Sequence, residues 1–271
     1  MPDIFTPVPP KQFKPALIEF ERVNVMRGDT LALDDVSLKI GAGEHVAIIG
    51  PNGCGKSTFI KAITRECYPL SRDETSLKIL GGDRWNVFDL RSMLGIVSSD
   101  LMTVCIRDMT GMDMVLSGFF SSIGIWPNHQ VTDDMRARAS KALQQLEVPH
   151  LAQRFTDQVS SGEGRRLLLA RALVHEPRAL ILDEPSTALD LFAQQELRAT
   201  LRKLAQSGIG IVMVTHHLSD LIPEIERVIL MSRGRIVADG PKREILTAPR
   251  LSKLFGLPVD LAERDGYYNL W

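Results

Sequence analysis

The residues that could carry chemistry begin with a glycine-rich loop, "GPNGCGKST". It follows the continuous apolar run "HVAIIG" and precedes a segment compatible with a helix, which is the context in which G-x-x-x-x-G-K-[ST] binds phosphate. Glycines let the backbone turn its N–H groups toward phosphate oxygens. We expect Lys56 to face the β- and γ-phosphates and Ser57 to face Mg²⁺. The predicted binding residues are Gly50, Pro51, Asn52, Gly53, Cys54, Gly55, Lys56, Ser57 and Thr58. The loop predicts a nucleoside triphosphate site, with a glycine-rich turn and an incidental lysine as the alternative.

Two adjacent acids form the second candidate site, at the end of the apolar segment "RALILDEPSTALD". Asp183 would emerge at a strand tip near Ser57, where a bound Mg²⁺ needs a carboxylate partner. Glu184 would point toward the γ-phosphate and polarise the attacking water. Acids after a strand also cap helices, and that role would be preferred if these residues stood alone. Beside a phosphate-binding loop, the catalytic interpretation is favoured.

Two further segments offer groups that could contact phosphate. In "VSSGEGRRLLLARAL", small residues at a helix start would leave N–H groups for an anion, or would be a glycine-rich N-cap without function. His216 ends the run "GIVMVTHH", where an imidazole could reach the γ-phosphate. A single histidine there would usually be structural, and the neighbouring His217 makes the assignment ambiguous.

The elements that would position these groups are predicted from hydrophobic patterns. "ALIEFERVNVM" and "LALDDVSLKI" alternate as antiparallel strands do, whereas "HVAIIG", "ALILD" and "GIVMVTH" are continuous apolar runs typical of buried parallel strands. From about residue 100 to 155 such runs are absent, and a capped amphipathic helix begins after Thr132. We expect an α/β core with its ligand site at the carboxyl ends of the strands and an inserted helical subdomain. The proline-rich residues 1–15 are expected to be an extended arm.

Composition narrows the classes of function. The 271 residues have 44% hydrophobic and 24% charged residues with a formal net charge of -1, so no general nucleic-acid footprint is predicted. No signal peptide or run of about 18 apolar residues is found, which favours the cytoplasm. Three cysteines without metal spacing fit reduced thiols.

Together these segments resemble the ATP-binding-cassette (ABC) ATPase family over residues 16–240. The motifs stand in family order: Walker A "GPNGCGKST", a signature-like "VSSGE", Walker B "LILD" with Glu184, a D-loop "STALD" and the switch histidine His216. The resemblance implies a P-loop NTPase (RecA-like) core with an N-terminal antiparallel β-layer and a helical subdomain at about 100–158. Residues 241–271 would form a C-terminal closing segment. The resemblance also implies ATP and Mg²⁺ as cofactors, catalytic roles for Glu184 and His216, and metal contacts from Ser57 and Asp183.

The family arrangement implies a head-to-tail homodimer. Each ATP would lie between the Walker motifs of one subunit and the signature of the other, so Ser160 and Gly162 would contact the partner's nucleotide, with Glu163 beside them. The usual Leu-Ser-Gly-Gly-Gln is replaced here, and the side chain of Ser161 with the charge of Glu163 is expected to weaken closure. Arg27 stands where an aromatic residue usually stacks on adenine, and its guanidinium plane can stack as well.

The Q-loop glutamine aligns with Ser99, which is too short to fill that role without a water molecule. These departures, with "GEHVAIIGPNG", "LRSMLGIVSSDL" and "VLSGFFSSIG", look most like the molybdate-transport-related subgroup.

The leading prediction of function is the ATP-hydrolysing subunit that energises a membrane transporter through a permease partner, located in the cytoplasm or peripherally at the inner face of the cell membrane. The apolar stretch "VLSGFFSSIGIW" would be the docking site, with ordinary helix packing as the alternative. A soluble regulatory ABC ATPase without a transporter is the second possibility. A nucleic-acid or ribosome ATPase is disfavoured because the chain has no second cassette, coiled-coil insertion or basic arm.

Overall fold

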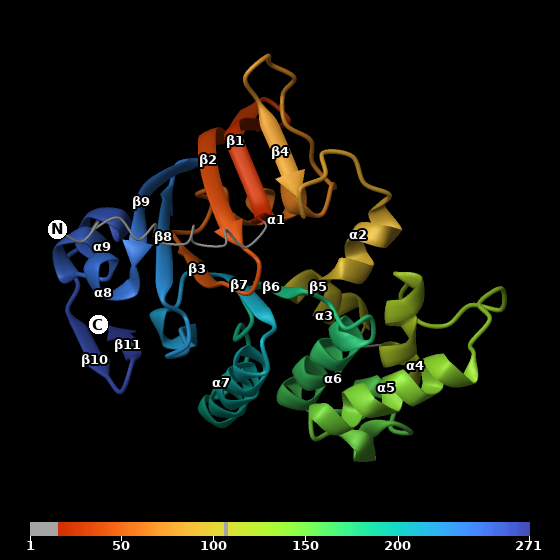
Figure 1. Ribbon diagram of the computed structural model, residues 1–271. Helices are drawn as coiled ribbons and strands as arrows, with labels where there is room; N and C mark the ends of the chain where they lie inside the picture. Colours follow the sequence, from red (N-terminus) through yellow and green to blue (C-terminus); the bar gives the residue numbers. More distant parts are fainter. Residues whose placement is uncertain (1–15, 106–107) are drawn as a thin grey trace, which may run out of the picture.

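The computed structural model describes residues 16–105 and 108–271, apart from the side chain of Ser99, and has a six-stranded sheet at its centre (Figure 1). The strand order is β5-β6-β7-β3-β8-β9, and all neighbours are parallel except β8 and β9. The strands are β3 (His45–Ile49), β5 (Leu94–Ser98), β6 (Ala179–Asp183), β7 (Gly210–Thr215), β8 (Arg227–Ser232) and β9 (Arg235–Pro241). The prediction of buried parallel strands at β3, β6 and β7 is confirmed. The arm predicted at 1–15 lies outside the described residues.

Strand β3 has no polar face because both of its sides are covered. Val46 and Ile48 pack into one hydrophobic cluster with the antiparallel layer, and Ala47 and Ile49 pack into a second cluster with the helices. Side chains alternate between the two faces of a strand, so a strand covered on both sides needs apolar residues throughout. This burial fixes the strand whose carboxyl end leads into the glycine-rich loop.

A three-stranded antiparallel layer covers one side of the central sheet, in the order β2-β1-β4. Its strands are β1 (Ala16–Arg27), β2 (Thr30–Gly41) and β4 (Ser76–Ile79). Helix α1 (Lys56–Ile63) contributes to the same hydrophobic cluster, and the ring of Phe59 stacks on Phe20 of β1 at 4.7 Å. The phosphate-loop helix is therefore held by both sheets.

Helices cover the other side of the sheet and extend into a helical region on the right of Figure 1. They are α3 (Ser99–Cys105), α4 (Gly111–Leu116), η1 (Ser117–Phe120), α5 (Asp133–Gln145), η2 (Pro149–Leu151), η3 (Thr156–Gln158), α6 (Ser161–Leu173) and α7 (Leu191–Gln206). Helix α2 (Val87–Met93) instead buries Leu90 in the hydrophobic cluster of the antiparallel layer. Thr132 caps α5 as predicted, since its hydroxyl accepts the Met135 N–H at 3.2 Å. Helix α6 begins at Ser161 and packs on α4 and α5 of the helical region and on β5 of the central sheet. The predicted signature segment is therefore connected to both the helical region and the sheet.

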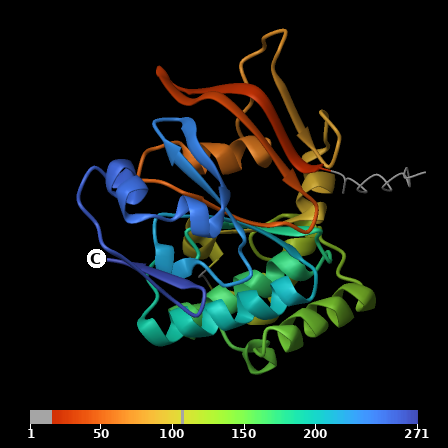
Figure 2. The same ribbon diagram turned by 60° about the vertical axis from the view of Figure 1, so that its left-hand side comes forward.

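The C-terminal segment packs near the β8–β9 side of the central sheet. It contains α8 (Lys242–Ile245), α9 (Ala248–Phe255) and a hairpin of β10 (Leu261–Arg264) and β11 (Tyr267–Leu270), which lies beside α7 (Figure 2). The buried Lys242 donates hydrogen bonds from Nζ to the carbonyls of Ile222, Pro223 and Gly266 at 3.1–3.3 Å. This segment therefore braces the chain just after η4 (Leu218–Asp220). The domain boundaries at 16, 240 and 100–158 stay predictions.

Candidate functional site

The glycine-rich loop joins the end of β3 to the start of α1. Gly53 and Gly55 have φ of 76° and 109°, in the region that side chains rarely adopt. At Gly55 a Cβ would also lie 2.5 Å from the Ala32 carbonyl oxygen, so packing and backbone angle both require glycine there. Gly55 is the N-cap of α1 and provides no side-chain acceptor. The helix therefore begins with its N–H groups directed toward the loop, an arrangement that suits an anion.

Lys56 is 6% exposed, and its ammonium group folds back on the loop. Nζ donates to the carbonyls of Gly50 at 2.8 Å and Pro51 at 3.0 Å, and it lies 3.7 Å from Glu184 Oε1. Burial makes a charged ammonium costly unless such partners compensate it. A triphosphate in the loop would offer Lys56 stronger, charged acceptors at the same place.

Asp183 lies at the carboxyl end of β6 and lines a cleft of about 340 Å³ together with Ser57. Its Oδ1 is buried and has no hydrogen-bond partner among the residues that the structure describes. Burial, followed by the charges of Glu184 and Asp100, raises the pKa of this carboxyl from 3.8 to about 6. A carboxylate oxygen beside a hydroxyl fits Mg²⁺, which binds through one or two carboxylates, hydroxyls and water.

Glu184 follows β6 in a backbone conformation that turns the chain sharply. Its φ is 50°, and its N–H donates to the Val214 carbonyl of β7 at 2.8 Å. Strained left-handed conformations of this kind cost of order 1–3 kcal/mol and gather at functional sites. The bend brings the two carboxylate oxygens of Glu184 toward different partners, Oε1 toward Lys56 and Oε2 toward His216.

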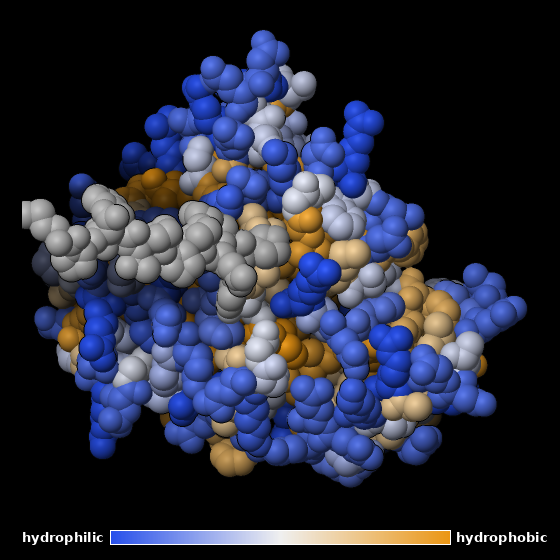
Figure 3. Space-filling model, in the orientation of Figure 1, coloured by the Kyte–Doolittle hydropathy of each residue, from blue (hydrophilic) through white to orange (hydrophobic). Residues whose placement is uncertain are grey.

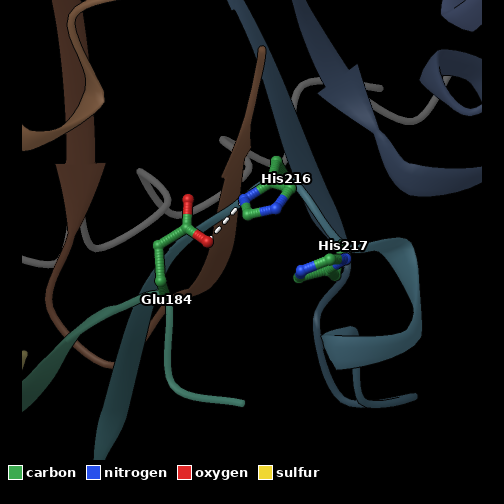
Figure 4. A group of neighbouring side chains, drawn as sticks. All are labelled: Glu184, His216 and His217. Carbon is green, nitrogen blue, oxygen red and sulfur yellow. Dashed lines mark ion pairs between the residues drawn. The ribbon is translucent and has the colours of Figure 1, made fainter. Parts of the chain in front are cut away.

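His216 follows β7 and meets Glu184 across the strand ends, with Nδ1 2.5 Å from Oε2 (Figure 4). The turn after β7 is fixed by Thr215, whose hydroxyl donates to Asp220 Oδ2 at 2.5 Å and accepts the His217 N–H at 3.0 Å. Burial raises the pKa of the Asp220 carboxyl. The imidazole is thus presented at the carboxyl ends of the parallel strands, the place expected for ligand chemistry in such sheets.

A second cleft, of about 460 Å³, lies on the other side of the loop and has walls that the sequence did not indicate. Arg27, for which stacking on adenine is predicted, lines it. Sequence reasoning missed the start of β2, Thr30, Leu31 and Ala32, and the β8–β9 turn, Arg233 and Gly234. The Gly234 N–H donates to the Cys54 carbonyl at 2.8 Å, so the β8–β9 turn braces the loop. The dipeptide "RG" between two apolar runs is a hairpin signal that could have predicted this turn.

The signature-like segment begins α6 with a reciprocal cap. Glu163 accepts the Ser160 N–H at 2.8 Å and the Ser160 hydroxyl at 2.9 Å, while Ser160 Oγ accepts the Glu163 N–H at 3.3 Å. The hydrogen bond from the Ser160 backbone lowers the pKa of the Glu163 carboxyl. Two N–H groups that the sequence left available for an anion are therefore already satisfied. The expectation of several open N–H groups is corrected at these two positions.

The structure brings most of the predicted site residues, which are far apart in the sequence, together in space. One cleft is lined by Arg27, Asn52, Gly53, Gly55, Lys56, Ser57, Thr58 and Glu184. Asp183 and Ser57 line the adjoining cleft, and His216 contacts Glu184. Gly50, Pro51 and Cys54 belong to the loop backbone. Ser160, Gly162 and Glu163 line neither cleft. Ser99 begins α3, and the prediction about its side chain lies outside the described residues.

Comparison with known proteins shows which family this set of site residues belongs to. The family model "ABC transporter" matches residues 33–187, more than half of the chain. The chain belongs to the ABC transporter ATP-binding family. It is accordingly an ATP-binding, ATP-hydrolysing cassette with the mixed α/β fold of that family.

Several relatives of this ABC cassette carry transport names. It is 34% identical over 92% of its length to the sulfate/thiosulfate import ATP-binding protein CysA of Bordetella bronchiseptica, of which it covers 69%. The hemin import ATP-binding protein HmuV of Rhodococcus jostii is 29% identical, with 95% of this chain and 86% of that protein covered. The uncharacterized ABC transporter ATP-binding protein YlmA of Bacillus subtilis is 29% identical over 90% of this chain and 92% of its own length.

Solved ABC cassettes have the same architecture. CbiO1 from Clostridium perfringens, part of the transporter complex cbiONQ, superposes with a TM-score of 0.74 at 27% identity, covering 89% of this chain and 94% of that one. The cassette MJ0796, a dimer bound to ADP and Pi, gives 0.67 at 26% identity over 83% of this chain and 98% of its own. Within the described residues of this chain, no helix has the length and apolar character needed to span a membrane.

Proposed function

We propose that two copies of this chain enclose two molecules of MgATP and hydrolyse them to energise a membrane permease. The observation that carries this proposal is the separation of the site residues into two groups. The loop, Glu184 and His216 meet at the strand ends, whereas Ser160 and Gly162 line neither cleft of the same chain. A second copy, turned head to tail, would supply the missing groups, consistent with the dimer of MJ0796.

In the proposed reaction, Lys56 leaves the carbonyls of Gly50 and Pro51 and binds the β- and γ-phosphates. Glu184 orients and polarises the water that attacks the γ-phosphate, and His216 holds the carboxylate and then reaches the phosphate. Ser57 and Asp183 would hold Mg²⁺, which neutralises charge that develops on the phosphate oxygens. Arg27 would stack on the adenine.

The permease contact is proposed for residues 118–126 of the helical region, because Val115, Leu116 and Ser117 at the start of the predicted docking stretch are buried. Hydrophobic surface lies beside α4, as it also does in the middle of the same face (Figure 3), and Trp126 is 58% exposed. This contact would hold the protein at the inner face of the cell membrane. Co-purification with a multi-span membrane protein would separate this function from that of a soluble regulatory ATPase.

Within the family, we propose that the chain belongs to the molybdate-transport-related subgroup, which the segments "LRSMLGIVSSDL" and "VLSGFFSSIG" resemble. The relatives named above are described as importers of sulfate, thiosulfate and hemin. The transported molecule is therefore to be identified on the co-purified permease, by measuring which oxyanion or chelate stimulates ATP hydrolysis.

The deciding experiment uses Glu184→Gln, which keeps the size of the side chain and removes its charge and basicity. Hydrolysis should become slow, while ATP should hold the two copies together persistently because it is no longer cleaved. Light scattering should then report about twice the monomer mass with ATP and the monomer mass after its removal. Fast hydrolysis by this variant would refute the role of Glu184.

A second change identifies the surface that closes. Ser160→Arg should abolish the ATP-dependent dimer of the Glu184→Gln protein by blocking the partner's nucleotide. Thr132→Arg is the matched control, since it removes the N-cap of α5, which like α6 has 13 residues. Loss of the dimer in both variants, or in neither, would contradict the proposed interface.

A further inference from the structure

Three side chains with metal-binding atoms gather at the ends of β6 and β7. They are Glu184, His216 and His217, and one ligand atom of each lies within 4.8 Å of those of the other two (Figure 4). We propose that this group binds a divalent transition-metal ion such as Zn²⁺, and that the bound ion holds the ATPase inactive. The inhibitory part of this proposal rests on the proposed catalytic role of Glu184, whereas the binding part does not.

The turn after β7 creates the cluster. In a continuing strand, neighbouring side chains point to opposite faces, so two adjacent histidines would not meet one ligand. Here the strand ends at Thr215, and its hydroxyl accepts the His217 N–H at 3.0 Å. As a result the imidazoles of His216 and His217 lie with ring centres 3.8 Å apart at a tilt of 41°. Both rings are then available on the side from which Glu184 approaches.

The spacing of the donor atoms suits an inserted ion after a small movement. Ligand atoms at about 2.0–2.1 Å from a tetrahedral zinc ion lie roughly 3.4 Å apart. Glu184 Oε2 and His216 Nδ1 are 2.5 Å apart, so they must separate by roughly 1 Å. A small rotation of the Glu184 side chain provides this separation. The exposed ring of His217 can adjust without disturbing the core.

The donor set selects the class of ion. Two imidazoles and one carboxylate suit zinc, copper or nickel, whereas Mg²⁺ prefers oxygen ligands alone. Three protein ligands with one position left for water are also the usual composition of an open zinc site. The proposed Mg²⁺ position at Ser57 and Asp183 has only oxygen donors. Mg²⁺ and the transition-metal ion would therefore bind at different sites because they prefer different ligand atoms.

The charges around the cluster also favour a cation. Asp183 and Asp220 stand beside the group, and the Asp220 carboxylate is fixed by the Thr215 hydroxyl. Lys56 opposes a cation, 3.7 Å from Glu184, and Lys61 and Arg165 act on Asp183 and Asp220 respectively. Lys56 faces Oε1, the carboxylate oxygen turned away from the histidines, and its Nζ is bound to two loop carbonyls. The ion would therefore sit on the histidine side of the carboxylate.

A bound ion would occupy the groups that the reaction needs. An oxygen of Glu184 that coordinates the ion cannot orient the attacking water, and His216 cannot leave to meet the phosphate. The alternative is that Glu184 and His216 form only an ion pair while His217 merely stacks on its neighbour. Because His217 has no role in the proposed reaction, its replacement distinguishes the two possibilities.

The binding experiment uses the full chain without nucleotide. Co²⁺ is titrated while its visible ligand-field absorption is recorded, and Zn²⁺ is then added to displace it. We expect one displaceable Co²⁺ per chain, and at least about tenfold weaker binding by His217→Ala. His129→Ala is the matched control, because that imidazole also stacks on a ring, that of Phe120 at 4.1 Å, and should leave binding unchanged. Circular dichroism checks folding, and His217→Gln replaces the alanine variant if that variant unfolds.

The activity experiment measures MgATP hydrolysis at buffered Zn²⁺ concentrations. Zinc should inhibit the unchanged protein and His129→Ala, and His217→Ala should require at least about tenfold more zinc at a basal rate within about twofold of normal. Absence of Co²⁺ binding, or equal binding by His217→Ala, would overturn the site. Binding without inhibition would overturn the regulatory part. Wild-type hydrolysis by Glu184→Gln would instead refute the proposed function and leave the cobalt titration to decide the site.

Discussion

Ser160 donates its hydroxyl proton to Glu163 Oε2 at 2.9 Å, within a cap that also uses the Ser160 N–H. A hydroxyl has one proton, so in the proposed dimer Ser160 can donate to the partner's nucleotide only after it releases this carboxylate. In the proposed dimer, the contact of Ser160 with Glu163, which stands where the family usually has glutamine, would therefore stabilise the open form.

We predict that Glu163→Gln strengthens ATP-dependent dimerisation several-fold in the Glu184→Gln background. Glutamine can keep the reciprocal cap but accepts the Ser160 hydroxyl more weakly, and it removes a negative charge that would face the partner's triphosphate. The effect is measured by light scattering with ATP, as the protein concentration at which the mass increase is half complete. A midpoint that shifts to higher protein concentration would contradict the account.

The loop lysine provides the test of nucleotide binding. Lys56→Ala should weaken MgATP binding by at least about tenfold, because each charged hydrogen bond to phosphate is worth roughly 1.5–3 kcal/mol. Titration with a fluorescent ATP analogue measures it. The exposed Lys78→Ala on β4 is the control for loss of one positive charge. Equal affinities of the two variants would remove Lys56 from the site.

Arg27 tests the base contact separately from the phosphates. Arg27→Ala should weaken ATP binding by about 0.5–2 kcal/mol, the range for a stacked cation. Binding of inorganic tripolyphosphate should stay unchanged, since that ligand has no base to stack. Competition against the fluorescent analogue gives both affinities. A parallel loss for both ligands would mean that Arg27 acts on the phosphates.

The raised pKa of Asp183 should make the stability of the protein depend on pH when neither nucleotide nor metal is bound. The Asp183 pKa of about 6 in the folded chain exceeds the ordinary 3.8, so the folded state binds the proton more tightly than the unfolded state. The stability from this group is therefore fully present at low pH and is lost as the pH rises toward and through 6.

The substitution Asp183→Asn should remove this dependence, because asparagine stays neutral. Its melting temperature should exceed that of the unchanged protein by more at about pH 8 than at about pH 5. The exposed Asp265→Asn serves as the control and should show no such trend. A stabilisation that shrinks as the pH rises would show that burial does not govern this carboxyl.

Patterns in the sequence predicted the parts of the fold that local chemistry decides. The apolar run at His45–Ile49 marks a strand covered on both faces, the glycines at 53 and 55 mark a loop that needs positive φ, and Thr132 marks the start of a helix. Each of these signals is complete within a few residues, which is why each could be interpreted without the structure.

Contacts between residues far apart in the sequence could not be predicted in the same way. Strands β8 and β9 were not predicted although Arg227–Ser232 is strongly apolar, and their turn proved to be a wall of the cleft that contains Lys56. The approach of Glu184 to His216 depends on β6 lying beside β7 and on the strained φ of Glu184. Neither pairing nor strain has a local sequence signal, because both are set by packing across the sheet.

The position of β3 in the middle of the sheet has a consequence for how the protein folds. Its neighbours are β7 and β8, and His45 pairs with Ile211, 166 residues further along the chain. Contacts so distant along the chain form late, because a long loop must be closed before they stabilise anything. We therefore expect local elements such as the β1–β2 hairpin and α5 to form before the site for a triphosphate. Nucleotide would accordingly protect the finished molecule from unfolding without guiding its formation.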